Sequence, residues 1–256
     1  PRDIFDVLSC APGVQLSFQG RKGMNFLSSR GGGTFIGGTS FAILLDGVYL
    51  PWTQTSRVLA NFPVDNIESI RVVRDASILT LGPLAGLGSI GAAVQGFIII
   101  KTKVPAKSET ELKLRYGSLN RTKIYASHGD RLENTHYFLS YNKHHDDGRE
   151  DWNNASDSDS LLFKGGYAAR GLSANVSLYH DWATRETMRS LDISRTSDSK
   201  WSYDPMNTLM ISANLAKAWN KTQTTSLGLY AGRVEADLHK RCFSNSSYSV
   251  EEQEET

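Results

Sequence analysis

The 256-residue chain is long enough for one large domain or two smaller ones, and its net charge of +1 gives no electrostatic argument for a nucleic-acid partner. No apolar run approaches the ~20 residues that a membrane helix needs, which excludes a helical membrane protein but not one that crosses with strands. Cys10 and Cys242 lie far apart, so neither a disulfide framework nor a zinc site is expected.

The chain opens with a short predicted helix. Ile4, Val7 and Leu8 fall at helical spacing, and Asp3 suits the N-cap position. Pro12-Gly13 ends the helix, because proline cannot continue it and glycine tolerates a left-handed turn.

A strand at Val14–Phe18 leads into a glycine-rich passage at residues 20–40. This passage contains Arg30-Gly31-Gly32-Gly33, so we considered a phosphate-binding loop. Such a loop needs Gly-Lys-Ser/Thr at the start of a helix, whereas Thr34-Phe35-Ile36 follows here and favours a strand. Nucleotide binding is therefore not supported.

A hairpin is predicted where Phe41–Leu45 runs into Asp46-Gly47, because glycine supplies the positive φ of a tight turn. The following residues 48–54 are expected to form a loop. Tyr49, Trp52 and Gln54 would be exposed on it, and their combination of apolar area with hydrogen-bonding groups suits a contact surface. The alternative is that Trp52 anchors a core.

Two further strands are predicted in the stretch from residue 66 to residue 102. Ser69–Val73 follows Pro63, which interrupts regular secondary structure, and the apolar run Phe97–Thr102 follows a second glycine-rich passage. The densest charge cluster of the chain, formed by Glu68, Arg71, Arg74 and Asp75, lies in and around the first of these strands.

These segments together resemble the plug domain of TonB-dependent outer-membrane receptors. The motifs that carry the resemblance occur in the family's order over residues 3–103: Pro12-Gly13-Val14 after the first helix, Ser28-Ser29-Arg30-Gly31, Ile67-Glu68-Ser69-Ile70-Arg71-Val72, and the closing strand Phe97–Thr102. Arg74-Asp75-Ala76-Ser77 is closest to the Lys-Asp-Ala-Ser of the glycan-importing branch. Leu81-Gly82 stands where most members have Tyr-Gly, which leaves the branch open.

From residue 109 the pattern changes to strands, turns and polar loops. Apolar residues alternate with polar ones, for example at Leu172–Tyr179 and Leu209–Ala216, which is typical of barrel strands with an apolar outer face. About seven such strands are expected up to residue 240. Alternation also occurs in a soluble β-sandwich, which remains the rival fold.

Loop lengths favour the barrel. Connections alternate short and long from residue 130 onward, and barrels have short periplasmic turns and longer external loops. Since the plug ends on the periplasmic side, the loops at 146–159 and 183–207 would be external. The tail at 241–256 is polar and acidic and is not expected to form a strand.

The predicted fold is an α+β plug domain (1–104) followed by antiparallel transmembrane β-barrel strands (109–240) and a polar tail (241–256). About 150 residues after residue 109 cannot supply the roughly 22 strands of a plugged barrel, so we expect an incomplete barrel. The chain starts with neither a signal peptide nor a TonB box, which also indicates a fragment.

No catalytic or metal site is predicted. His144 and His145 are adjacent on a strand and therefore point to opposite faces, so they are badly placed to share one metal. The acidic residues of the following loop suit a solvated surface. No Gly-x-Ser-x-Gly elbow or placed carboxylate pair is present, so no enzyme activity and no cofactor are expected.

The resemblance implies a bacterial outer-membrane receptor that imports an external ligand with energy from the inner-membrane TonB complex. Its partners would be TonB, outer-membrane lipid and a small ligand, of iron-siderophore or cobalamin type in the first instance. A SusC-like glycan importer and a soluble β-rich binding or adhesion module are the alternatives. The expected ligand-binding residues are Arg30, Phe35, Tyr49, Trp52 and Gln54; those expected between plug and barrel are Glu68, Arg71, Arg74 and Asp75.

Overall fold

A computed structural model describes residues 3–17, 26–29, 41–50, 52–74, 96–149, 152–187, 199–244 and 247–255. The chain divides into two compact units. The first comprises Pro1–Thr102 with Thr187–Ser190, and the second comprises Lys103–Glu186 with Leu191–Thr256. No helix in the described part of the chain is long and apolar enough to cross a membrane.

The first unit combines a small mixed sheet with helices. Its sheet has the order β4-β3-β6-β5, in which β3 and β6 are parallel and the other neighbours are antiparallel, and β1 and β2 form a separate pair. In chain order its elements are α1 (Ile4–Ser9), β1 (Val14–Ser17), β2 (Phe26–Ser29), β3 (Phe41–Leu45), β4 (Val48–Leu50), α2 (Trp52–Asn61), the 3-10 helix η1 (Val64–Asn66), β5 (Ile67–Arg74) and β6 (Gly96–Thr102).

The predicted first helix is confirmed as α1. The Asp3 carboxylate accepts a hydrogen bond from the Asp6 backbone N–H at 3.0 Å, so it caps the helix as expected. Ile4, Phe5 and Leu8 are buried, which gives this short helix the apolar face that holds it in place.

The tight turn after β3 is also confirmed, and it is tied to the end of β6. Asp46 and Gly47 both have positive φ, at 48° and 86°. The Asp46 carboxylate accepts the Thr102 backbone N–H at 2.9 Å through one oxygen and the Thr102 hydroxyl through the other. The turn therefore fastens β3 to its parallel neighbour in addition to the backbone ladder.

The loop expected at residues 48–54 is wrong. Val48–Leu50 form β4, and the helix α2 begins at Trp52. The helix is explained by residues farther along the chain: Thr55, Val58, Leu59 and Phe62 are buried and recur at the i, i+3, i+4, i+7 spacing of one helical face.

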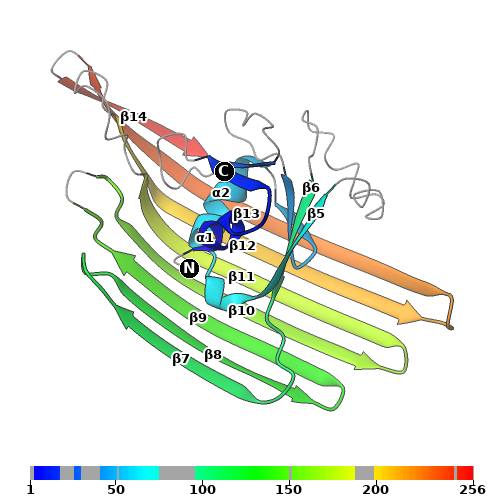
Figure 1. The fold of residues 1–256 in the computed structure, drawn as a ribbon. Helices are drawn as coiled ribbons and strands as arrows, with labels where there is room; N and C mark the ends of the chain where they lie inside the picture. Colours follow the sequence, from blue (N-terminus) through cyan, green and yellow to red (C-terminus); the bar gives the residue numbers. More distant parts are fainter. Residues whose placement is uncertain are drawn as a thin grey trace. The chain divides into compact units, whose positions relative to one another are not determined.

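The second unit is one antiparallel sheet of eight strands that follow one another in chain order, from β7 to β14 (Figure 1). The strands lengthen steadily from 8 residues in β7 to 21 in β13. Their bounds are β7 Glu109–Tyr116, β8 Thr122–Leu132, β9 Thr135–Asp146, β10 Ser156–Ala169, β11 Leu172–Thr187, β12 Ser199–Ala218, β13 Thr224–Ser244 and β14 Ser247–Glu255.

The last strand corrects the expectation that residues 241–256 contain none. Its composition is polar, but its backbone pairs with β13, and the register sets Glu251 opposite Lys240 and Glu252 opposite His239. The Lys240–Glu251 pair favours antiparallel pairing, although the like-charged Asp237 and Glu254 are also directly opposed. The sheet is open, with β7 and β14 at its two edges.

Connections at the two ends of the sheet differ in length. At one end, residues 133–134, 170–171 and 219–223 join β8 to β9, β10 to β11 and β12 to β13. At the other end, residues 117–121, 147–155 and 188–198 make the connections. The alternation expected from the sequence is thus present, although the two long loops are shorter than predicted because the strands continue into them.

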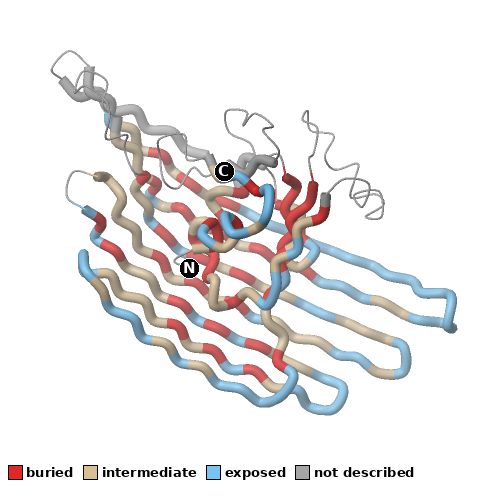
Figure 2. Tube along the Cα trace, in the orientation of Figure 1, coloured by how far each residue is buried: buried red, intermediate tan, exposed pale blue. Residues whose placement is uncertain are grey.

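Burial alternates along the strands, as Figure 2 shows. On β9, Phe138, Ser140 and Asn142 are buried, whereas Leu139 and Tyr141 between them are exposed. The buried face is therefore rich in polar residues and the exposed face in apolar ones. This arrangement is the reverse of an ordinary soluble sheet and is the one predicted for barrel strands.

The exposed apolar residues form a band that runs diagonally across the rows of paired residues on neighbouring strands. On β7 the band includes Leu114, which pairs with Ile124. The same row continues to the charged residues Lys143 and Asp159 on β9 and β10, so the band has left this row by β9. On β12 and β13 it lies nearer the short turns, where Leu215 pairs with Leu227. The strands are consequently tilted relative to the band, as strands of a membrane barrel are.

Candidate functional site

The residues expected to bind ligand do not form one group in the structure. Arg30 and Phe35 lie outside the described residues. Tyr49 is on β4 and packs against a buried cluster that includes Leu44 and Phe97. Burial raises the pKa of the Tyr49 phenol, so it is a neutral hydrogen-bonding group at physiological pH.

Trp52 and Gln54 lie in the first turn of α2, not on a loop. They are therefore attached to a helix whose remaining turns contribute Val58 and Leu59 to the core of the unit. A helical frame fixes the backbone of a binding residue better than a loop does.

The charged residues expected between plug and barrel belong to one strand. Glu68 and Arg71 are exposed on β5, and Arg74 is its last residue. Asp75 lies outside the described residues. The charges are thus held on the edge strand of the four-stranded sheet.

A row of buried side chains crosses the inner face of the second unit, the face defined above by Ser140 and Asn142. The register sets Tyr125 opposite Asn142, Asn142 opposite Ser160, and Ser160 opposite Asp181. All four are almost fully buried, and Asp181 has no exposed area. Three strand-to-strand steps therefore place four hydrogen-bonding groups side by side.

Sequence reasoning assigned no role to these wall residues. The signal was present, because each occupies a polar position in an alternating strand, but alternation alone does not say which polar positions are buried. Ser127, Ser140, Ser158, Thr208 and Ser212 continue the same buried polar face. Hydroxyl and amide groups are both donors and acceptors, so this face is polar along several strands.

An ion pair joins loop 117–121 to Asp146, the last residue of β9 before loop 147–155. Arg121 contacts the Asp146 carboxylate through Nε at 2.7 Å and Nη2 at 2.5 Å. The second Asp146 oxygen accepts the Gly148 backbone N–H at 3.0 Å, and the Asp147 N–H donates to the Leu119 carbonyl. These bonds order the start of the longer loop, so it is held in place at this end of the sheet.

His144 and His145 lie next to each other near the end of β9. His145 contacts the carboxylates of Asp157, at 2.7 Å, and Asp147, at 2.9 Å. His144 precedes it on the same strand and therefore points to the other face. Within the described residues, no group of three or more His, Cys, Asp or Glu side chains could hold a metal ion.

Comparison with known proteins finds one family model that matches part of the chain. Residues 1–89 match the family model described as TonB-dependent Receptor Plug Domain. No curated protein sequence matches the chain.

Several solved structures share the fold over almost all of the chain. The P. aeruginosa protein FpvA, solved with heterologous pyoverdines, is 14% identical with a TM-score of 0.70, covering 98% of this chain and 35% of its own. The siderophore receptor PiuA from Acinetobacter baumannii is 14% identical with a TM-score of 0.64, covering 94% and 35%. The siderophore receptor PirA from the same species is 15% identical with a TM-score of 0.53, covering 97% and 44%. The chain thus spans less than half the length of each.

Proposed function

We propose, from the premise that residues 1–89 are a TonB-dependent receptor plug domain, that this chain is the plug and first wall strands of an outer-membrane importer. In this proposal an external ligand binds residues of the plug and of the external loops of the wall. TonB of the inner-membrane energising complex then acts on the plug, and the ligand passes into the periplasm.

The observation that carries the proposal is the joining of a plug domain to a sheet with reversed polarity. The inner face of that sheet buries Asn142, Ser160 and Asp181, while its outer face exposes Leu114 at 70% and Leu229 at 62%. Such a sheet suits lipid on one side and a polar interior on the other.

The same observation speaks against the rival, a soluble β-rich binding module. A soluble sandwich buries its apolar face, and it rarely exposes a contiguous apolar patch larger than a few hundred Å². Here the apolar side chains on the outer face of seven successive strands are exposed, among them Leu112, Leu139, Phe163, Val176, Ile211 and Leu227.

A siderophore-type ligand is the first candidate, because FpvA and PiuA, which share the fold at TM-scores of 0.70 and 0.64, are described with pyoverdines and as a siderophore receptor. A cobalamin-type ligand fits the same architecture. The sequence Arg74-Asp75-Ala76-Ser77 favours a glycan as the second candidate. The proposed contact residues are Arg30, Phe35, Tyr49, Trp52 and Gln54, with Glu68, Arg71, Arg74 and Asp75 proposed between plug and wall.

Membrane fractionation of cells that express the complete receptor tests the class of protein. We expect the protein to sediment with outer membranes and to resist extraction by alkaline carbonate, since its outer face needs lipid. Release into the soluble fraction in a folded, protease-resistant form would favour the soluble module instead.

Ligand uptake tests the site. Cells supplied with iron-loaded siderophores, cobalamin or an oligosaccharide should accumulate one of them, and collapse of the proton gradient should abolish the accumulation. Trp52→Ala should weaken uptake, whereas Trp182→Ala, a change to an exposed outer-face residue, is the matched control. Equal uptake by both variants would remove Trp52 from the site.

A further inference from the structure

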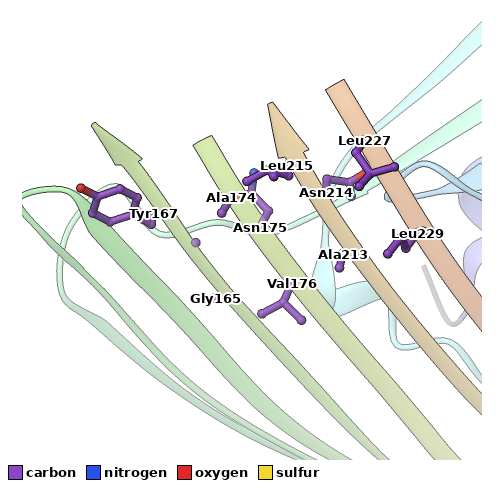
Figure 3. Close-up of a pocket in the computed structure, with 11 residues that line it drawn as sticks. Gly165, Tyr167, Ala174, Asn175, Val176, Ala213, Asn214, Leu215, Leu227 and Leu229 are labelled. Carbon is purple, nitrogen blue, oxygen red and sulfur yellow. The ribbon is translucent and has the colours of Figure 1, made fainter. Parts of the chain in front are cut away.

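The outer face of the wall has a groove of about 510 Å³ near the short turns of β10 to β13 (Figure 3). Its volume lies within the range of roughly 300–1,000 Å³ that small-molecule sites occupy. Ala174 and Val176 of β11, Ala213 and Leu215 of β12, and Leu229 of β13 contribute to its lining.

Small residues at neighbouring positions create this groove. The register sets Gly165 beside Val176, Ala174 beside Tyr167, and Ala213 beside Leu229. Each pair joins a residue with little or no side chain to a large one, so the large side chains form walls around a low floor. The walls are apolar and outward-facing, which suits a hydrocarbon chain.

Cationic residues stand at the turn end of the groove. Lys217 is the next outward position after Leu215 on β12. Its Nζ donates to the Arg170 carbonyl at 3.1 Å and lies 5.9 Å from the centre of the Trp219 ring. The turn residues Arg170 and Lys221 are also exposed.

Acidic residues are absent from this part of the sequence. The segments 164–178 and 208–232, which contain β10–β13 around the groove and both of its turns, include Lys164, Arg170, Lys217 and Lys221 but no Asp or Glu. Trp219 donates its indole N–H to Thr225 at 3.1 Å and is 67% exposed, so its ring is available at the edge of the apolar region. Aromatic and cationic residues at this position suit the headgroup level of a bilayer.

We propose that this groove is a binding site for one anionic phospholipid. The acyl chain lies between Tyr167 and Leu229, and the phosphate lies beside Lys217, with Arg170 and Lys221 near it. The inference rests on the proposed membrane location and adds a specific ligand to it. Charge complementarity with Lys217, Arg170 and Lys221 favours an anionic headgroup over a neutral one at this end of the groove.

Native mass spectrometry of the complete receptor, purified in detergent and mixed with equal amounts of phosphatidylglycerol and phosphatidylcholine, tests the site. We expect phosphatidylglycerol to be retained preferentially. Lys217→Gln should reduce that preference about fivefold, as expected for the loss of one cation near an anionic headgroup, and Lys217→Arg should restore it.

A second pair of variants tests the groove itself. Ala213→Phe fills the floor and should abolish retention of either lipid at this site. Ala126→Phe places the same ring on the outer face of β8, away from the groove, and should leave retention unchanged. Equal effects of the two substitutions would overturn the proposal.

Three other outcomes would also overturn it: no preference between the two lipids, displacement of the lipid by millimolar inorganic phosphate, or preferential retention of lipopolysaccharide. These failures differ from a failure of the proposed function. If the proposed function is wrong, the protein does not fractionate with membranes. If only the lipid site is wrong, the receptor inserts into membranes and takes up ligand but lacks the lipid preference.

Discussion

A single arginine on the outer face of β12 provides a direct test of the wall's orientation in lipid. The outward positions of this strand run from Asn207 through four apolar residues to Lys217. About ten residues at roughly 3.4 Å each separate the two polar limits. A tilt of about 40° converts this length of about 34 Å to about 26 Å, close to the ~25 Å apolar band of a membrane barrel.

Ile211 lies near the middle of this span and is 41% exposed. Ile211→Arg should therefore place a guanidinium near the bilayer midplane, where the substitution costs about 2–4 kcal/mol. The ratio of folded to unfolded protein should fall by a factor of roughly 30 to 1,000, since each 1.4 kcal/mol is tenfold.

Asn214→Arg is the matched control, because this exposed residue is on the same strand but faces the other side. A surface change of this kind should alter stability by about 0.5 kcal/mol or less. The measurement is denaturant unfolding of the complete receptor in phospholipid vesicles, followed by tryptophan fluorescence. Equal shifts for the two variants, or a loss below about 1 kcal/mol for Ile211→Arg, would refute the assignment of this face to lipid.

Three further predictions concern individual contacts. Asp46→Asn should lower plug stability by about 1–2 kcal/mol in thermal unfolding, because the Thr102 hydroxyl loses its carboxylate acceptor. Gly96→Ala should cost about 1–3 kcal/mol by the same measurement, since its Cβ would lie 2.5 Å from a backbone oxygen, whereas Gly117→Ala, with 3.9 Å to its nearest neighbour, should be neutral. Arg121→Ala should speed amide exchange in loop 147–155 about fivefold, as its partner carboxylate holds the loop; unchanged exchange there would contradict that role.

The sequence was most informative where periodicity and turn chemistry agree. The strands at 41–45 and 97–102 were predicted because an apolar run is bounded by a turn signal, and the wall strands because outward apolar residues alternate with polar ones. The helix α2 was not predicted, because Tyr49 and Trp52 were interpreted as exposed residues of a loop. The apolar spacing of Val58, Leu59 and Phe62 begins only after them.

The buried polar row could not be predicted for a different reason. Asn142, Ser160 and Asp181 come together through the register of three strands, and register depends on the pairing of residues about 20 positions apart. The strand β14 was not predicted for a similar reason, because its polar, acidic sequence gives no strand signal of its own and its pairing with β13 depends on register.

On the proposed orientation, the growth in strand length from 8 to 21 residues gives the external end of the wall an uneven height. At the same rise and tilt, β13 extends about 54 Å along the membrane normal, roughly twice the apolar band. The longest strands would then extend beyond the lipid on the external side, whereas β7 would end near the membrane surface. A large external protein such as an antibody or a phage fibre would then reach the membrane surface more easily beside β7 than beside β13.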